Sequence, residues 1–151
     1  MIRRSGCAYS VNTDTLKIEH PVLWDINNPK LYICVCELLR NGEVVDWEEC
    51  KFGFREAKFT TDHGFFLNGR HVKLHGCCEH HDLGALGAAV NRAAIARKLN
   101  KLREIGINAI RTSHNMPAVE WMELADEMGF LILSEGFDMW EKSKTEYDYS
   151  R

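Results

Sequence analysis

Between residues 71 and 138, short apolar runs alternate with segments of helical periodicity, and this alternation most limits the folds open to the chain. The apolar runs extend from His71 to about Cys77, through INAIRTSH (107–114) and through FLILSEGFD (130–138). Strands that read as nearly continuous apolar runs are typical of parallel sheets covered by helices. The order strand, helix, strand, helix, strand therefore predicts an α/β unit. It fits a doubly wound sheet and a (β/α)8 barrel equally well.

Two helices are expected between these strands. The first has an N-cap candidate at Asn91, a stop at Gly106, and apolar residues at spacings of four and three: Ile95, Leu99, Leu102 and Ile105. For the second, Pro117 suits the first helical position and Gly129 the end. Its predicted buried face consists of Val119, Met122 and Ala125.

The first 57 residues have a pattern of strands instead. Two runs, LYICVCELL (31–39) and EVVDWEECKFGF (43–54), flank the dipeptide Asn41-Gly42. Such a dipeptide predicts a hairpin, because both residues tolerate the positive φ of a type I′ turn. A second one, Asn68-Gly69, is placed to link a strand ending near Leu67 to the next. Fewer than 60 residues give too few strands for a complete β-sandwich, so we expect the tail of a larger β domain.

Charge and hydropathy exclude two classes of partner. The formal net charge is −3 and the isoelectric point is about 6.2, so no basic excess attracts a nucleic acid backbone. No apolar run approaches the roughly 18 residues of a membrane span. The opening MIRRSGCAYS has a basic pair without the apolar core of a signal peptide, and the compartment stays open.

The stretch HGCCEHHDLGALG (75–87) gathers thiol, imidazole and carboxylate groups, which are common zinc ligands. Adjacent Cys77 and Cys78 would point to opposite faces of a strand, and the chain has no CxxC or HExxH motif, so no zinc site is predicted. Six cysteines are too few for a disulfide scaffold in a chain of 151 residues. Cys34 and Cys36, two apart in one strand, are interpreted as packing residues.

Polar residues follow all three apolar strands. In a parallel sheet the carboxyl ends of the strands meet at one edge, where binding and catalytic groups collect. That edge is predicted to carry Cys78, Glu79, His80, His81 and Asp82 from the first strand, Arg111, Thr112, Ser113 and His114 from the second, and Ser134, Glu135 and Asp138 from the third.

Several motifs in order resemble glycoside hydrolase family 2, which includes β-galactosidases, β-glucuronidases and β-mannosidases. They are WDINNPKLY (24–32), FGFRE (52–56), FFLNGRHVKLHG (65–76), HHDLGALGAA (80–89), INAIRTSHN (107–115) and DEMGFLILSEGFDMWEK (126–142). Together they cover nearly the whole chain, and the fourth and last are most similar to bacterial β-galactosidase-like members. β-Glucuronidase and β-mannosidase remain the alternatives.

The resemblance implies a fold of two parts. Residues 1–57 would be the C-terminal part of an immunoglobulin-like β-sandwich, and residues 58–151 the first three strands of a TIM barrel. In the family, the acid/base and nucleophilic glutamates come from later strands, so neither is expected in this chain. Retaining hydrolysis needs two carboxyl groups roughly 5 to 5.5 Å apart. The resemblance therefore implies a fragment of a retaining β-glycosidase that is inactive alone.

The resemblance also implies roles at the strand ends. His80 and His114 match histidines that contact sugar hydroxyls, and Arg111 matches an arginine beneath the catalytic carboxylates. Arg111 could instead only pair with Glu135. Glu135 suits substrate contact or a structural pairing with Arg111 or His114. Substrate contact is expected for Asp138 and Trp140, with loop packing as the alternative for Trp140.

Further expectations concern cofactors, association and the remaining tryptophans. Some family members bind magnesium through a glutamate and a histidine after the third strand; EGFDMWEK has no histidine, so no cofactor or metal is predicted there. Three strands cannot close a barrel, so the open edges predict self-association. Trp24, Trp47 and Trp121 are expected in the core. Alternatives from other classes are a non-catalytic carbohydrate-binding module and a metal-binding domain around residues 77–82.

Overall fold

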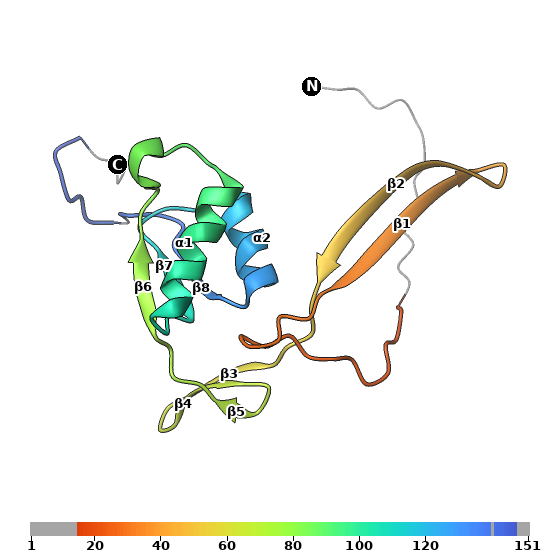
Figure 1. Ribbon diagram of the computed structural model, residues 1–151, viewed down its shortest axis with the longest axis horizontal. Helices are drawn as coiled ribbons and strands as arrows, with labels where there is room; N and C mark the ends of the chain where they lie inside the picture. The colour runs from red at the N-terminus through yellow and green to blue at the C-terminus, as the bar shows by residue number, and fades with distance from the viewer. Residues whose placement is uncertain (1–14, 140, 148–151) are drawn as a thin grey trace.

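The computed structural model describes residues 15–139 and 141–147, and in this part of the chain the strands form three separate sheets (Figure 1). The first is an antiparallel hairpin of β1 (Tyr32–Arg40) and β2 (Glu43–Phe52). Its turn confirms the prediction, since Asn41 and Gly42 have φ values of 55° and 84°. Figure 1 shows the hairpin projecting from the rest of the molecule.

The second sheet joins β3 (Ala57–Thr60), β4 (Gly64–Leu67) and β5 (Arg70–His71) through antiparallel pairs. The predicted strand from His71 to Cys77 is wrong, because β5 ends at His71 and the next strand begins at Gly76. The side chain of Asn108 explains the break. It accepts a hydrogen bond from His75 N at 2.9 Å and donates one to Lys73 O at 3.0 Å, so a side chain satisfies backbone groups of the segment between the two strands.

The third sheet is parallel, in the order β6 (Gly76–Glu79), β7 (Ala109–Thr112), β8 (Leu131–Ser134). Two helices connect its strands, α1 (Arg92–Glu104) and α2 (Val119–Met128), and a 3-10 turn, η1 (Gly84–Leu86), precedes α1. The α/β order predicted from the sequence is confirmed.

Both helices cover the same face of this sheet. The register partners Cys77, Ile110 and Ile132 pack on a core formed mainly by α1 and α2. Cys78, Arg111 and Leu133 are register partners one position further along, so they belong to the opposite face. A doubly wound sheet has helices on both faces, whereas a (β/α)8 barrel has them only outside. The arrangement is therefore that of a barrel.

The predicted limits of α1 are confirmed, but not its full apolar stripe. The side chain of Asn91 accepts a hydrogen bond from Ala94 N at 3.0 Å, and Gly106 has a φ of 84°. Ile95 and Leu99 are fully buried. Ile105 is the residue that caps the helix end and is 74% exposed.

The predicted buried face of α2 is mostly wrong. The helix begins at Val119 and not at Pro117, and Val119 is 69% exposed. Of the predicted face only Ala125 is buried, together with Trp121 and Leu124, whose spacing of three and four suits a helix face equally well.

Trp24 joins the N-terminal part to the barrel part. It is buried in a second core with Phe65, Leu67 and Val72. Its indole Nε1 donates to Asp126 O in α2 at 2.7 Å. Gly129, which ends α2 with a φ of 76°, leaves no room here, because a β-carbon would overlap the carbonyl of Ile26.

Two packing expectations fail on the hairpin. Trp47 is 61% exposed and Cys36 is exposed too, although Trp24 and Trp121 are buried as expected. The reason is that a two-stranded sheet has no second layer in the part of the chain described. None of the described helices is long and apolar enough to cross a membrane.

Candidate functional site

The carboxyl ends of β6, β7 and β8 bring most of the predicted site residues to one edge. His80 follows β6, Arg111 lies near the end of β7, and Glu135 follows β8 directly. Because the three strands are parallel neighbours, these side chains start from the same end of the sheet. This placement agrees with the prediction made from the strand order.

Arg111, His114 and Glu135 form the centre of the site. The guanidinium Nε of Arg111 donates to Oε1 of Glu135, and Oε2 of the same carboxylate lies 2.8 Å from Nδ1 of His114. Nη2 of Arg111 lies 3.5 Å from the same imidazole nitrogen. Both pairings that the sequence offered for Glu135 are thus present. The peptide bond between Ser113 and His114 is cis.

The environment keeps Glu135 ionised. Loss of solvation acts to raise the pKa of Glu135, but the hydrogen bonds and charges of His114 and Arg111 outweigh it and lower that pKa below its usual value. The backbone N–H of Glu135 donates to Oγ1 of the buried Thr112 at 2.9 Å. A carboxylate held in this way is oriented and charged, which suits binding better than proton donation.

Cys78 holds the other side of the guanidinium. Its Sγ accepts a hydrogen bond from Nη1 of Arg111 at 3.5 Å. The nearby Ser113 hydroxyl and the hydrogen bond from Arg111 lower the pKa of the Cys78 thiol. The order of strands predicts Cys78 at this edge but gives it no role. Part of this contact could be predicted, because alternate residues of a strand share one face. Cys78 and Arg111 lie on the same face as register partners in neighbouring strands.

His80 lies beside His114, with ring centroids 5.5 Å apart and an interplanar angle of 85°. His81 is exposed. The carboxylate of Asp82 accepts a hydrogen bond from the backbone N–H of Gly84, two residues further along, at 2.8 Å. This bond stabilises the turn after β6. Two imidazoles are thus presented together, and because Nδ1 of His114 faces Glu135, that ring offers a ligand its Nε2.

Asp138 and Lys144 form an ion pair at the margin of the site. The hydrogen bond from Lys144 is the main cause that lowers the pKa of Asp138. Both residues line a hollow of about 380 Å³ together with Arg111, His114, Ser134, Glu135, Gly136 and Phe137. Trp140, which the sequence assigned to substrate contact, lies outside the described residues.

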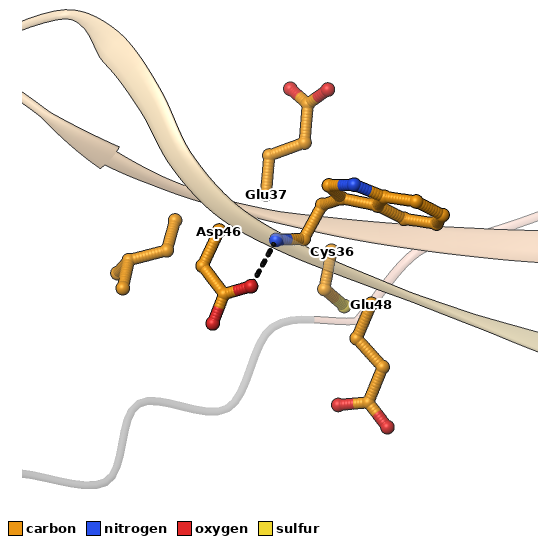
Figure 2. A pocket seen from close by; sticks show the side chains of 6 residues that line it. Cys36, Glu37, Asp46 and Glu48 are labelled. Atoms are coloured by element: carbon orange, nitrogen blue, oxygen red, sulfur yellow. Dashed lines mark hydrogen bonds between the residues drawn. The ribbon is translucent and has the colours of Figure 1, made fainter.

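A second hollow, of about 450 Å³, lies on the β1–β2 hairpin, and Figure 2 shows it from close by. Its labelled residues are Cys36, Glu37, Asp46 and Glu48, and the dashed line is the hydrogen bond from Trp47 N to Asp46 Oδ1 at 2.9 Å. Its acidic side chains are exposed and have no basic residue among the lining. It is also distant in topology from the strand ends, so we place the candidate site at those ends.

A metal centre does not fit the side chains found here. Across residues 15–139 and 141–147, no three His, Cys, Asp or Glu side chains are placed to hold a metal ion. At the position where magnesium was considered, both oxygens of Glu135 already face Arg111 and His114. A hard cation needs several convergent oxygens, and this carboxylate is engaged.

Two family models match the chain. The model described as "Glycosyl hydrolases family 2, TIM barrel domain" matches residues 59–150, and the one described as "Glycosyl hydrolases family 2" matches residues 4–55. The first of these alone covers more than half of the chain.

Curated relatives are similar over most of this chain. The β-galactosidase BoGH2A of Bacteroides ovatus is 50% identical over 141 residues, which are 93% of this chain and 17% of that protein. A putative β-glucuronidase of Formosa agariphila is 40% identical over 136 residues, 90% of this chain and 13% of its own length. The chain thus spans less than a fifth of either relative.

Solved structures resemble the chain in the same way. A glycosyl hydrolase family 2 member from Bacteroides cellulosilyticus has a TM-score of 0.80 and 43% identity, covering 86% of this chain and 17% of that structure. A β-glycosidase from Bacteroides vulgatus has a TM-score of 0.81 and 40% identity, with the same two coverages.

Proposed function

This chain belongs to glycosyl hydrolases family 2, and we propose that it contributes one side of the active site in a retaining β-glycosidase that acts on β-galactosides. The fold of the family is present as the beginning of a TIM barrel preceded by part of an immunoglobulin-like β-sandwich. The observation that carries the proposal is the cluster of Arg111, Glu135 and His114 at the carboxyl ends of the barrel strands, with His80 beside it.

In this proposal the cluster binds and orients, while the two reacting carboxyl groups come from elsewhere. Retaining hydrolysis requires one carboxylate as nucleophile and one carboxyl group, of raised pKa, as proton donor. The pKa values of Glu135 and Asp138 are lowered by their basic partners, which is the wrong direction for a proton donor. We therefore expect the 151-residue chain alone not to hydrolyse glycosides.

Arg111 supports catalysis by holding a carboxylate. A guanidinium has five N–H donors in a fixed plane. Glu135 accepts from Nε and Cys78 from Nη1, whereas Nη2 lies 3.5 Å from His114 Nδ1, which already faces the Glu135 carboxylate. Both terminal nitrogens keep a second N–H, and these can bind a further carboxylate in a bidentate manner. That arrangement would keep a nucleophilic carboxylate ionised and correctly oriented.

His80, His114 and Asp138 supply sugar contacts. The imidazole of His80 can donate to one hydroxyl and accept from another, that of His114 offers Nε2, and a carboxylate accepts from two hydroxyls. The hollow of about 380 Å³ beside Asp138 is within the size range of small-ligand pockets. These groups suit a neutral, hydroxyl-rich ligand.

Charge balance favours a galactoside over a glucuronide. Recognition of a uronate carboxylate calls for a cation that is not already neutralised. Of the two permanent cations that line the hollow, Lys144 is paired with Asp138, and Arg111 is paired with Glu135 and in this proposal also holds the nucleophile. The 50% identity to a β-galactosidase points the same way. β-Glucuronidase is the second candidate, supported by the 40% identity to a putative β-glucuronidase.

The test compares two chromogenic substrates with the complete protein. We expect kcat/KM for p-nitrophenyl β-D-galactoside to exceed that for the β-D-glucuronide by at least about 100-fold, since a buried carboxylate without a partner costs several kcal/mol. A preference for the glucuronide would establish the second candidate. Turnover of the galactoside by the 151-residue chain alone, well above a blank, would contradict the proposed absence of the catalytic pair. Calorimetric binding of galactose to that chain would indicate a carbohydrate-binding module instead.

A further inference from the structure

Glu79 places a carboxylate in a buried position at the last residue of β6. Its exposed fraction is 9%, and it follows Cys78 in a strand where alternate residues face the helices. The ammonium group of Lys98, in the middle of α1, forms an ion pair with Oε2 of Glu79. A buried charge is costly unless it is paired, so the carboxylate of Glu79 depends on Lys98.

The same ammonium group reaches past Glu79 to the following turn. Lys98 Nζ donates a hydrogen bond to the backbone carbonyl of Asp82 at 3.0 Å. The turn is closed by a hydrogen bond from Asp82 N to His80 O at 2.7 Å, and Ser113 N anchors the strand end by donating to Glu79 O at 2.8 Å. Lys98 therefore contacts the residues on both sides of the pair His80-His81.

We infer that Lys98 is a positioning residue for His80, which it fixes opposite His114 by binding the side chain of Glu79 and the backbone of Asp82 together. The inference deepens the proposed function and rests on it, because His80 is taken as a sugar contact. Figure 1 shows that α1 lies beside β6 and that the segment after β6 leads over to the start of α1. Lysine suits the task, since one ammonium offers three donors.

The two contacts of Lys98 can be separated by mutation. Replacing Lys98 with methionine removes both and leaves the Glu79 carboxylate buried without a counter-charge. Adding Glu79→Met removes that charge, and apolar residues of similar volume are often as stable as a buried ion pair. The double variant Lys98→Met/Glu79→Met therefore regains stability while still lacking the bond to Asp82 O. Lys101→Met is the matched control on the same helix, where the lysine pairs only with Glu104 near solvent.

In the complete protein we expect Lys98→Met to lower the melting temperature and to raise KM for the galactoside. The double variant should recover the melting temperature of the wild type but keep a KM raised about tenfold, the effect of one lost hydrogen bond, with kcat nearly unchanged. Lys101→Met should match the wild type in both. Full recovery of KM in the double variant would overturn the inference, because Lys98 would then serve stability alone.

A readout without substrate separates this inference from the proposed function. In the 151-residue chain with ¹³C-labelled histidine, the ring signal of His80, assigned with His80→Asn, should shift in the double variant and its cross-peak to the His114 ring should weaken. Unchanged signals would overturn the positioning role even if the galactoside is cleaved. Shifted signals together with no cleavage by the complete wild-type protein would leave the positioning role standing and the proposed function wrong.

Discussion

Nδ1 of His114 lies 2.8 Å from Oε2 of Glu135, while the other oxygen of that carboxylate accepts a hydrogen bond from Arg111. One carboxylate thus joins a residue just after β7 to one within it. The imidazole proposed to bind sugar and the guanidinium proposed to support catalysis are held by the same group, so a change at Glu135 should disturb both.

Glu135→Gln should make the free energy of unfolding less dependent on pH. The pKa of Glu135 is lowered in the folded chain. Its charge therefore stabilises fully above the unfolded-state pKa of about 4.3, and this stabilisation is lost as the pH falls through the folded-state value. The variant should be less stable than the wild type at pH 7 and approach it as the pH falls below about 4. Urea unfolding across this pH range measures the difference.

Glu104→Gln is the control for that experiment. Glu104 lies on the exposed side of α1, where its ion pair with Lys101 is screened by water. The free energy of unfolding of Glu104→Gln should equal that of the wild type at every pH. A constant offset between Glu135→Gln and the wild type from pH 7 to pH 3 would show that the charge of Glu135 is not what stabilises the fold.

His80→Ala should weaken substrate binding in the complete protein. Its imidazole lies beside that of His114, and the loss of one hydrogen bond to a sugar hydroxyl raises KM about tenfold. His63→Ala, in the exposed turn between β3 and β4, should leave steady-state kinetics unchanged. Equal KM values for the two variants would remove His80 from the site.

Asp138→Asn should raise KM for the galactoside about tenfold, because an amide accepts hydrogen bonds from sugar hydroxyls less strongly than a carboxylate. Lys144→Gln tests whether the ion pair matters for this role, since Lys144 keeps Asp138 charged. A milder rise of KM is expected there, because Asp138 itself remains. Normal kinetics for Asp138→Asn would assign the pair to loop structure only.

Leu124→Ala should destabilise the barrel part by about 2 to 5 kcal/mol, the usual cost of emptying a buried leucine site. Leu124 is 5% exposed, whereas Val119 in the same helix is 69% exposed. Val119→Ala should therefore change the free energy of unfolding by no more than about 0.5 kcal/mol. Equal effects in urea titrations would mean that α2 packs with a different face.

The 151-residue chain should self-associate. The hairpin exposes large apolar side chains, among them Ile33 at 57% and Val35 at 54% exposure. Each of its two strands also has one edge without a partner in the described part of the chain. Such edges and patches favour pairing between chains. Sedimentation velocity should reveal larger species as the concentration rises, and fewer of them for Ile33→Lys/Val35→Lys. Ile105→Lys, at an exposed site after α1, is the control; a monomer at every concentration would contradict this prediction.

Local backbone chemistry explains which parts of the fold were predictable. The turns at Asn41-Gly42 and Asn68-Gly69 follow from residues that accept a positive φ, and the start of α1 follows from the side chain of Asn91. In each case the residues that form the feature are neighbours in the chain. Turns and helix caps of this kind can therefore be predicted from a few consecutive residues.

Contacts between distant segments explain the errors. The predicted strand from His71 to Cys77 fails because Asn108, more than 30 residues away, binds its backbone. The predicted face of α2 is wrong because Val119 and Trp121 both fit a helical period, and only the position of the sheet decides between them.

The candidate site shows the same division. The position of Arg111 and Glu135 at neighbouring strand ends was predictable from the order of elements, and their pairing was one of two alternatives. Lys144 and Lys98 could not be assigned, because a loop and a helix bring them to their carboxylates. Ion pairs of this kind carry no spacing rule in the sequence.

The glycine that ends α2 has a consequence for protein engineering. Because Gly129 touches the backbone of Ile26, and Trp24 bonds to Asp126, the linker and the helix are shaped to each other. A chimaera that takes its β-sandwich from one homologue and its barrel from another would have to exchange residues 24–28 together with the helix terminus. A chimaera that takes residues 24–28 and the end of α2 from different homologues would join two surfaces that do not pack together.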